Sequence, residues 1–207
     1  MNPKHIRTFE IEGTRFHLTD RGDGTLQVTS IHPYDETEYH WALQASKSCW
    51  HICRCGHRVK ILREHTEVTP EQWNSIFSVN ARAPFFLCKA ALPYLKESAK
   101  PMVINISSVV GFKGYANQSA YSSSKHALAG FTKVFAKEVQ PFGIRVHLIS
   151  PGGVATEMVR QTRPDINPDD LIQPEEICEI VRFLVTRKGK GTIDQFYIRR
   201  FNSLAFD

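Results

Sequence analysis

Residues 106–125, ISSVVGFKGYANQSAYSSSK, decide how the rest of the chain is interpreted. They contain Ser108, then Tyr121, and then Lys125 four residues after the tyrosine. If this segment is helical, Tyr121 and Lys125 lie on one face, because residues at i and i+4 are neighbours on a helix. An ammonium beside a phenol lowers the pKa of the phenol, so the two form a proton-transfer pair. The pair alone is a weak signal, because a solvated helix face produces it as well.

The residues around this stretch predict a strand–helix–strand unit. The short apolar run 102–106 is typical of a buried strand, and the amphipathic run 127–135 is typical of a helix. A second strand is predicted over 144–149, and it leads into Ser150-Pro151-Gly152. Gly143 predicts the end of the intervening helix. The serine, the tyrosine and the lysine therefore belong to one α/β unit.

Five motifs in this part of the chain resemble the short-chain dehydrogenase/reductase family in order and spacing. They are Val79-Asn80, Asn105-Ile106-Ser107-Ser108, Tyr121-x-x-x-Lys125, Ile144-Arg145-Val146 and Pro151-Gly152-x-Val154-x-Thr156. The resemblance implies an α/β, Rossmann-like three-layer fold, with a parallel sheet and helices on both faces. It also implies an oxidoreductase that uses NAD or NADP and transfers a hydride between a secondary alcohol and a ketone.

The resemblance assigns a role to each matched residue. Tyr121 is the general acid/base, Lys125 lowers its pKa, and Ser108 positions the substrate oxygen. Asn80 breaks its helix locally and anchors a water near the lysine; the alternative is a tolerated polar residue. The residues implied in cofactor binding are Asn80, Tyr121, Lys125, Pro151, Gly152, Val154 and Thr156. Read without the family, Pro151-Gly152-Gly153 is simply a turn.

Residues 1–66 do not continue this pattern. Segments 7–12, 14–18 and 25–29 alternate apolar and polar residues, which predicts a small antiparallel meander. The family instead opens with a strand, a glycine-rich turn and a helix that hold the pyrophosphate. Here Gly22 and Gly24 begin that spacing, but its third position is Gln27. We therefore predict an atypical segment of unknown role over 1–66 and a catalytic portion over 67–207. One hypothesis for this change is a replaced N-terminus, through a gene fusion, an alternative start or a shifted reading frame.

A cluster of cysteines and histidines precedes this boundary. Cys49, Cys53 and Cys55 alternate with histidines, and thiolate and imidazole are zinc ligands. The spacing does not match the usual Cys-x-x-Cys pairs, so we predict no metal and ordinary residues in an irregular segment. Residues 57–63 are a candidate substitute strand.

Further helix and strand signals follow the boundary. Thr69, Pro70 and Gln72 predict a capped helix start. The apolar residues of that helix are expected in the core and against a second copy of the chain. A last helix is predicted from Gln173 and a last strand over 192–200. The polar segment 157–171 is the expected lid over the substrate.

Composition limits the class of protein. The chain has 207 residues, 42% hydrophobic and 23% charged, with a net charge of +5. No long block of like charge and no membrane-length apolar run occur, so we expect a cytoplasmic protein that binds neither nucleic acid nor membrane. The expected partners are a small alcohol or carbonyl substrate and a homodimer or homotetramer. The alternative is a catalytically inactive or truncated relative that acts as a dimerising protein.

Overall fold

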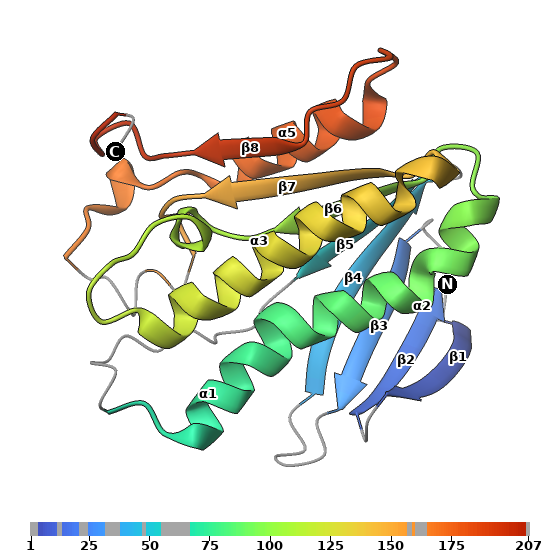
Figure 1. The fold of residues 1–207 in the computed structure, drawn as a ribbon, viewed down its shortest axis with the longest axis horizontal. Coiled ribbons are helices and arrows are strands. Elements are labelled where there is room, and N and C mark those ends of the chain that lie inside the picture. Colours follow the sequence, from blue (N-terminus) through green and yellow to red (C-terminus); the bar gives the residue numbers. More distant parts are fainter. Residues whose placement is uncertain are drawn as a thin grey trace.

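The computed structural model describes residues 4–11, 14–20, 25–31, 38–46, 49–54, 67–156, 159 and 165–205. The described strands form two sheets, one antiparallel and one parallel (Figure 1). The two sheets correspond to the two parts that the sequence pattern separates.

The antiparallel sheet has five strands in sequential order. They are β1 (Lys4–Ile11), β2 (Thr14–Asp20), β3 (Thr25–Ile31), β4 (Glu38–Ser46) and β5 (Cys49–Arg54). Each strand pairs with the next in antiparallel register, which confirms the predicted meander and adds two strands to it. The prediction of an irregular segment was wrong for residues 49–54, because they pair with β4 from Cys49 opposite Ser46 to Arg54 opposite Trp41. The candidate strand 57–63 lies outside the described residues.

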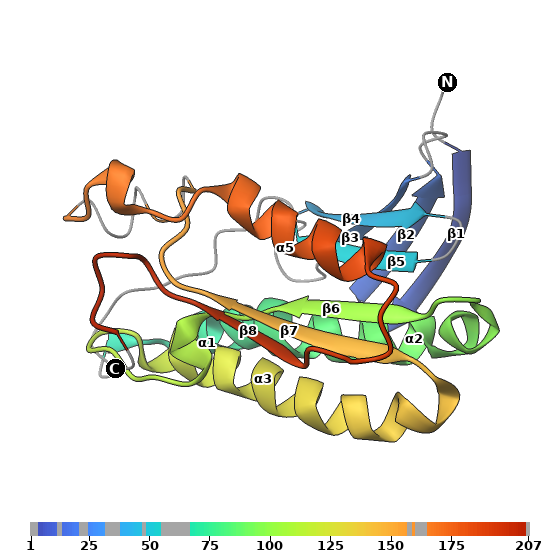
Figure 2. The same cartoon turned by 90° about the horizontal axis from the view of Figure 1, so that it is seen from above.

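The parallel sheet has three strands in the order β6-β7-β8. They are β6 (Met102–Ile106), β7 (Arg145–Pro151) and β8 (Gln195–Ile198). Parallel neighbours need a crossover connection. Helix α3 (Ser119–Val139) makes the first crossover and α5 (Pro174–Thr186) makes the second. Figure 2 shows α3 and α5 on opposite sides of the sheet, which is the predicted three-layer α/β arrangement.

One long helical run precedes β6. It consists of α1 (Pro70–Phe77), a π-helical segment η2 (Ser78–Arg82) and α2 (Ala83–Glu97). The predicted capping box at its start is confirmed. The Gln72 amide donates to Thr69 Oγ1 at 3.3 Å, and the Thr69 amide donates to Gln72 Oε1 at 3.2 Å. The capping box thereby satisfies two backbone amides at the helix start that have no partner within the helix.

Two apolar clusters hold the layers together, one on each face of the parallel sheet. Strand β6 supplies both, because successive side chains point to opposite faces. Val103 packs toward α2 and α3 with Leu95, Phe135 and Val146. Met102 and Ile104 pack toward α5 with Ile149, Ile177 and Leu184. Strands that are apolar on both faces are typical of a parallel sheet covered on both sides.

Short 3-10 segments connect the main elements. They are η3 (Val109–Gly111), η4 (Gln140–Phe142) and η5 (Pro168–Asp170). Gly143 ends α3 as predicted, but only after the turn η4, and it has a left-handed φ of 70°. The start of α5 is confirmed by the capping box of Gln173 and Glu176.

In the run 70–97, Trp73 is 40% exposed and Phe85 is 45% exposed in the single chain, so the expected packing against a second copy stays a prediction. One expectation needed correction. The last strand is shorter than residues 192–200, because β8 ends at Ile198. Beyond β8, the Arg199 guanidinium donates to the carbonyls of Arg200, Phe201 and Ser203, and these contacts hold a turn in place of a longer strand. Residues 157, 158 and 160–164 of the predicted lid lie outside the described residues.

Candidate active site

Tyr121 and Lys125 lie one turn apart near the start of α3. Both side chains are buried. Lys125 Nζ is 5.9 Å from the centroid of the Tyr121 ring, and it donates to the Ile106 carbonyl at 3.3 Å. The helix thus places the ammonium beside the phenol, and the carbonyl at the end of β6 fixes the position of the ammonium.

Ser108 joins the ends of two parallel strands. It lies two residues beyond β6, and its hydroxyl donates to the Pro151 carbonyl, at the end of β7, over 3.3 Å. The same oxygen accepts from the Val110 amide at 3.4 Å. The preceding Ser107 donates to the Lys125 carbonyl at 3.1 Å. The two serines therefore connect the end of β6 to β7 and to α3, the helix that carries Tyr121 and Lys125.

Asn80 is fully buried in the π-helical segment η2, where the sequence analysis expected a local break in the helix. Its Nδ2 donates to Ser124 Oγ at 3.0 Å. The Ser124 hydroxyl in turn donates to the Tyr121 carbonyl at 2.7 Å. The Asn80 amide is therefore connected to the helical turn that carries Tyr121 and Lys125. Its role in holding a water stays a prediction.

A buried polar contact sets the angle between β6 and α3. The Asn105 amide donates to Thr132 Oγ1 at 2.9 Å, and the Thr132 hydroxyl donates to the Leu128 carbonyl at 2.7 Å. Both partners are buried, so removing either one would leave the other without its hydrogen bond and would cost free energy. It keeps the serine end of β6 against the tyrosine end of α3.

The loop after β7 is held by backbone contacts on both sides. The Gly152 amide donates to the Ile198 carbonyl of β8 at 2.7 Å. Val154 forms an isolated parallel bridge with Ile172. The Thr156 amide donates to the Val154 carbonyl at 2.7 Å, and Thr156 Oγ1 accepts from the Val159 amide at 3.4 Å. The loop is thus more than a surface turn, because β8 and the segment before α5 define its shape.

Two buried polar atoms near this site have no hydrogen-bond partner in the part of the chain that the structure describes. They are Gln118 Oε1, just before α3, and Ser150 Oγ, just before Pro151. Gln118 is 6% exposed and Ser150 is fully buried. Buried polar groups are nearly always paired, so an unpaired one marks a place where a ligand atom or water is expected. The sequence analysis missed both, because a glutamine three residues before a tyrosine carries no recognisable pattern.

The resemblance to the family implies a cofactor site with a nicotinamide end and a pyrophosphate end. Two of the features expected at the nicotinamide end lie at the carboxyl ends of β6 and β7: Lys125 donates to the Ile106 carbonyl, and the loop 151–156 begins at the last residue of β7. The pyrophosphate end requires a strand, a glycine turn and a helix N-terminus. The described strands before residue 67 are antiparallel neighbours in sequential order with no described helix between them, so they do not form that unit.

Comparisons with known proteins point the same way as this geometry. A family model described as short chain dehydrogenase matches residues 55–167, more than half of the chain. An uncharacterised oxidoreductase of Bacillus subtilis is 34% identical over 149 residues, which cover 62% of this chain and 58% of that protein. Cyclopentanol dehydrogenase of Comamonas testosteroni is 33% identical over 135 residues, covering 60% and 54%. The chain thus matches little more than half the length of these relatives.

Solved structures show the same fold. A short chain dehydrogenase of Escherichia coli complexed with NADPH gives a TM-score of 0.65 at 29% identity, covering 73% of this chain and 62% of that one. A 4-hydroxyisoleucine dehydrogenase mutant complexed with NADH and succinate gives 0.63 at 26% identity, covering 70% and 65%. The α/β arrangement around β6, β7 and α3 is therefore shared with proteins of known structure.

Proposed function

Because the chain belongs to the short-chain dehydrogenase family, we propose that it transfers a hydride between NAD(P) and a secondary alcohol or ketone. The observation that supports this best is the contact of α3 with the end of β6. Ser107 donates to the Lys125 carbonyl, Lys125 donates to the Ile106 carbonyl, and Val109, the residue after Ser108, packs with Tyr121. In open α/β sheets, ligands bind outside the carboxyl ends of the strands. The proposed catalytic portion is residues 67–207.

In the direction of ketone reduction, each side chain has one task. The Tyr121 phenol gives its proton to the carbonyl oxygen as the carbonyl carbon receives the hydride. The Lys125 ammonium stabilises the phenolate that is left. The Ser108 hydroxyl turns from the Pro151 carbonyl to the substrate oxygen and holds it by a hydrogen bond. Alcohol oxidation uses the same groups in reverse, with Tyr121 as the base.

The nicotinamide cofactor supplies or accepts the hydride when it is bound. We propose that Lys125 contacts its ribose and that Pro151, Gly152, Val154 and Thr156 form the surface against its ring. Asn80 supports this arrangement through Ser124 and anchors a proton-relay water. Both NAD and NADP agree with these residues, because none of them reads the 2′ position of the adenine ribose.

A second candidate function is favoured by the antiparallel sheet. Strands β1–β5 occupy the part of the chain where the family has its pyrophosphate-binding unit. A relative that no longer binds the dinucleotide would keep the helices that present apolar side chains to solvent. These are Phe85 and Tyr94 on α2 and Val134 on α3, which are 45%, 53% and 56% exposed. In this reading the chain is a dimerising protein without turnover.

Turnover, and its dependence on the Tyr121 hydroxyl, distinguishes the two candidate functions. We expect purified wild-type protein to oxidise NADH or NADPH in the presence of a panel of ketones. Tyr121→Phe should lower kcat by about 10²–10⁴-fold, the contribution of a positioned general acid. Tyr115→Phe removes the same hydroxyl from a residue that is 44% exposed, and it should leave kcat unchanged.

Equal activity of wild type and Tyr121→Phe would refute the proposed catalytic role. A folded wild-type protein that sediments as a dimer and shows no turnover with any ketone would favour the second candidate. The unfolding midpoint of each variant, compared with wild type, shows whether lost activity reflects lost structure.

A further inference from the structure

We propose that Arg200 binds an oxyanion, a carboxylate or a phosphate, at the open end of the parallel sheet. Its assignment to the substrate rests on the proposed function and would make the substrate a hydroxy or oxo acid, or a phosphate ester. Arg200 belongs to none of the five family motifs, so this inference comes from the structure alone.

Three residues occupy equivalent places beyond the three parallel strands. Ser108 is the second residue after β6, Gly153 is the second after β7, and Arg200 is the second after β8. Parallel strands end at one edge of the sheet, as Figure 1 shows for β7 and β8. Contacts join these ends directly: Ser108 Oγ donates to the Pro151 carbonyl, and the Gly152 amide donates to the Ile198 carbonyl. Arg200 therefore lies at the same edge as the candidate site.

The Arg200 side chain lies against the loop proposed to face the nicotinamide. A Cβ atom added at Gly153 would be 3.4 Å from Arg200 Cδ and 3.8 Å from its Nε. The same atom would be 3.0 Å from Leu171 Cδ2. The side-chain stem therefore packs over a glycine that has no side chain of its own. A long apolar stem that packs on such a surface keeps the charged end accessible to solvent and to a ligand.

The turn that carries Arg200 is held rigidly. The Arg199 guanidinium donates to the carbonyls of Arg200, Phe201 and Ser203 at 3.0, 2.8 and 2.7 Å. The Ser203 hydroxyl donates to the Arg200 carbonyl at 2.7 Å. The Asn202 amide donates to the Asp170 carboxylate in η5. These contacts fix the Arg200 backbone, so less conformational entropy is lost when its side chain binds a ligand.

The charge of Arg200 is not balanced within the described residues. Its guanidinium is half-buried, and it makes no ion pair or hydrogen bond with any of them. The neighbouring Asp170 carboxylate instead accepts from Asn202. A guanidinium presents a planar fork of donors that matches carboxylate and phosphate oxygens in a bidentate way. An oxyanion is the ligand that this position fits.

The strand spacing sets the reach of such a substrate. Adjacent strands lie about 4.8 Å apart, so the backbones beyond β6 and β8 are separated by roughly 10 Å. Ser108 would hold the reacting oxygen over β6, while Arg200 would hold the oxyanion from the β8 side. This separation favours a substrate whose anionic group is not bonded directly to the reacting carbon.

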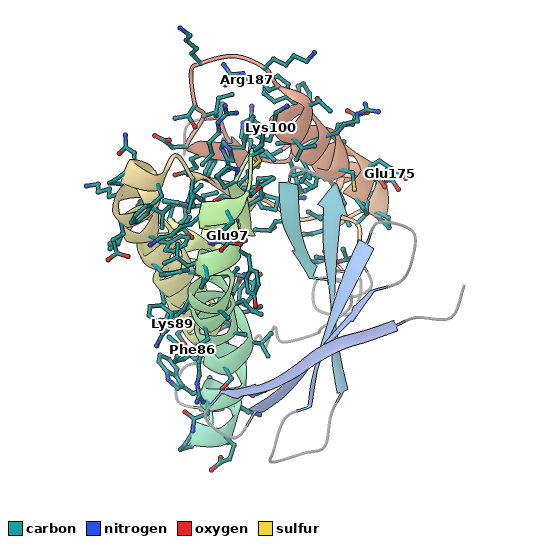
Figure 3. All side chains as sticks on the ribbon, turned by 90° about the vertical axis from the view of Figure 1, so that its right-hand side faces the viewer. Phe86, Lys89, Glu97, Lys100, Glu175 and Arg187 are labelled. Carbon is teal, nitrogen blue, oxygen red and sulfur yellow. The ribbon has the colours of Figure 1, made fainter. Side chains whose placement is uncertain are left out.

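The test measures anion binding without turnover, so that it does not depend on the proposed function. Malonate and inorganic phosphate are titrated into the full chain by calorimetry, with malonamide as the uncharged counterpart of malonate. The variants are Arg200→Gln, Arg200→Lys and the control Lys190→Gln. Lys190 lies in the loop between α5 and β8, before β8 begins and therefore at the opposite edge of the sheet. Figure 3 labels Arg187, at the end of α5, where this loop starts.

We expect wild type and Lys190→Gln to bind malonate or phosphate with the same affinity and not to bind malonamide. Arg200→Gln should bind the same anion at least ~10-fold more weakly, and Arg200→Lys should recover part of the loss, because charge remains but the fork is lost. Unfolding midpoints without ligand confirm that the variants are folded. Equal anion binding by Arg200→Gln and wild type, an equal loss in Lys190→Gln, or no binding by wild type would overturn the proposal.

A second measurement tests whether the oxyanion belongs to the substrate or to the cofactor. If it belongs to the substrate, Arg200→Gln raises KM for ketones that carry a carboxylate or phosphate and leaves KM for cyclohexanone and for the nicotinamide cofactor unchanged. A rise in KM for the cofactor instead would overturn the assignment to the substrate and indicate a cofactor phosphate. Absence of turnover in wild type, with anion binding that depends on Arg200, would refute the proposed function while the oxyanion site stands.

Discussion

The parallel sheet and the antiparallel sheet of this chain differ in the edge at which their strands end. In the parallel sheet, β6, β7 and β8 all end at one edge, and the residues that follow β6 and β7 contact the end of the next strand. In the antiparallel sheet, neighbouring strands run in opposite directions, so their carboxyl ends alternate between two edges. Only the parallel sheet concentrates loop residues at one place, and the candidate site lies there.

The two sheets also depend on different kinds of chain contact. The antiparallel strands are sequential neighbours, whereas each parallel pair encloses a helix that must pack back onto the sheet. The packing of α3 against β6 holds the helix that carries Tyr121 and Lys125 at the end of β6, where Ser107 donates to the Lys125 carbonyl. The geometry of the site therefore depends on the apolar core of the parallel part, and changes in that core test the comparison most strongly.

The largest expected effect on stability comes from Leu148, in the middle strand β7. This side chain is 2% exposed, and truncating a buried leucine to alanine typically costs about 2–5 kcal/mol, because contacts are lost and a cavity remains. We expect Leu148→Ala to lower the free energy of unfolding by that amount in urea titrations. Leu204→Ala, at a site 76% exposed, should change it by less than about 0.5 kcal/mol. Equal, small effects of both would show that the parallel part has no fixed core.

A smaller effect, dependent on pH, is expected from His147 in the same strand. Burial lowers the pKa of His147 below its usual 6.5, against the opposing effect of the Ile193 carbonyl, which accepts from Nδ1 at 2.6 Å. Above pH 6.5 the imidazole is neutral in the folded and in the unfolded chain, and its contribution to the free energy of unfolding is fully present. As the pH falls from 6.5 through the lowered pKa, the unfolded chain takes up the proton first, so this contribution is lost.

The measurement is the unfolding free energy of wild type and His147→Asn between pH 5 and 8. Asparagine keeps a donor for the Ile193 carbonyl but does not ionise. The difference between the two proteins should shift in favour of the variant as the pH falls below 6.5. A difference that is constant with pH would mean that His147 does not titrate differently in the folded chain. Subtracting the variant removes the contribution of the other histidines.

The smallest expected effect is a gain from Gly130 on the exposed side of α3. An added Cβ would meet no atom within 4 Å, and alanine favours a helix interior over glycine by about 1 kcal/mol. Gly130→Ala should therefore raise the free energy of unfolding by up to about 1 kcal/mol. Gly143→Ala should lower it, since Gly143 has a φ of 70°, where alanine is strained. If Gly130→Ala is destabilising, α3 is not the regular helix described.

The sequence predicted well those features that depend on local chemistry. The capping box at Thr69, the strands β6 and β7 and the glycine after α3 follow from side-chain periodicity and backbone preference. It also predicted that Tyr121 and Lys125 would share a helix face, because that depends on spacing alone. Irregularity was wrongly predicted for residues 49–54, because the spacing of the cysteines and histidines there does not indicate a strand, although these residues pair with the preceding strand β4.

Features that depend on contacts between distant residues were not predictable. The end of β8 is set by Arg199 binding three carbonyls of the following turn, which no periodicity reveals. The unpaired atoms of Gln118 and Ser150 become visible only when burial is known. The position of Arg200 over Gly153 requires the alignment of two strand ends. Each of these places adds to the candidate site, so the site is larger than its motifs.

The central claim is that the parallel part carries the nicotinamide end of a cofactor site. The most direct measurement is a titration of the full chain with reduced nicotinamide mononucleotide, which lacks the adenylate half, following nicotinamide fluorescence and the melting temperature together. The account predicts saturable fluorescence change with a raised melting temperature, since a ligand that binds only the folded state stabilises it. A folded chain that shows neither change at any concentration would contradict the account.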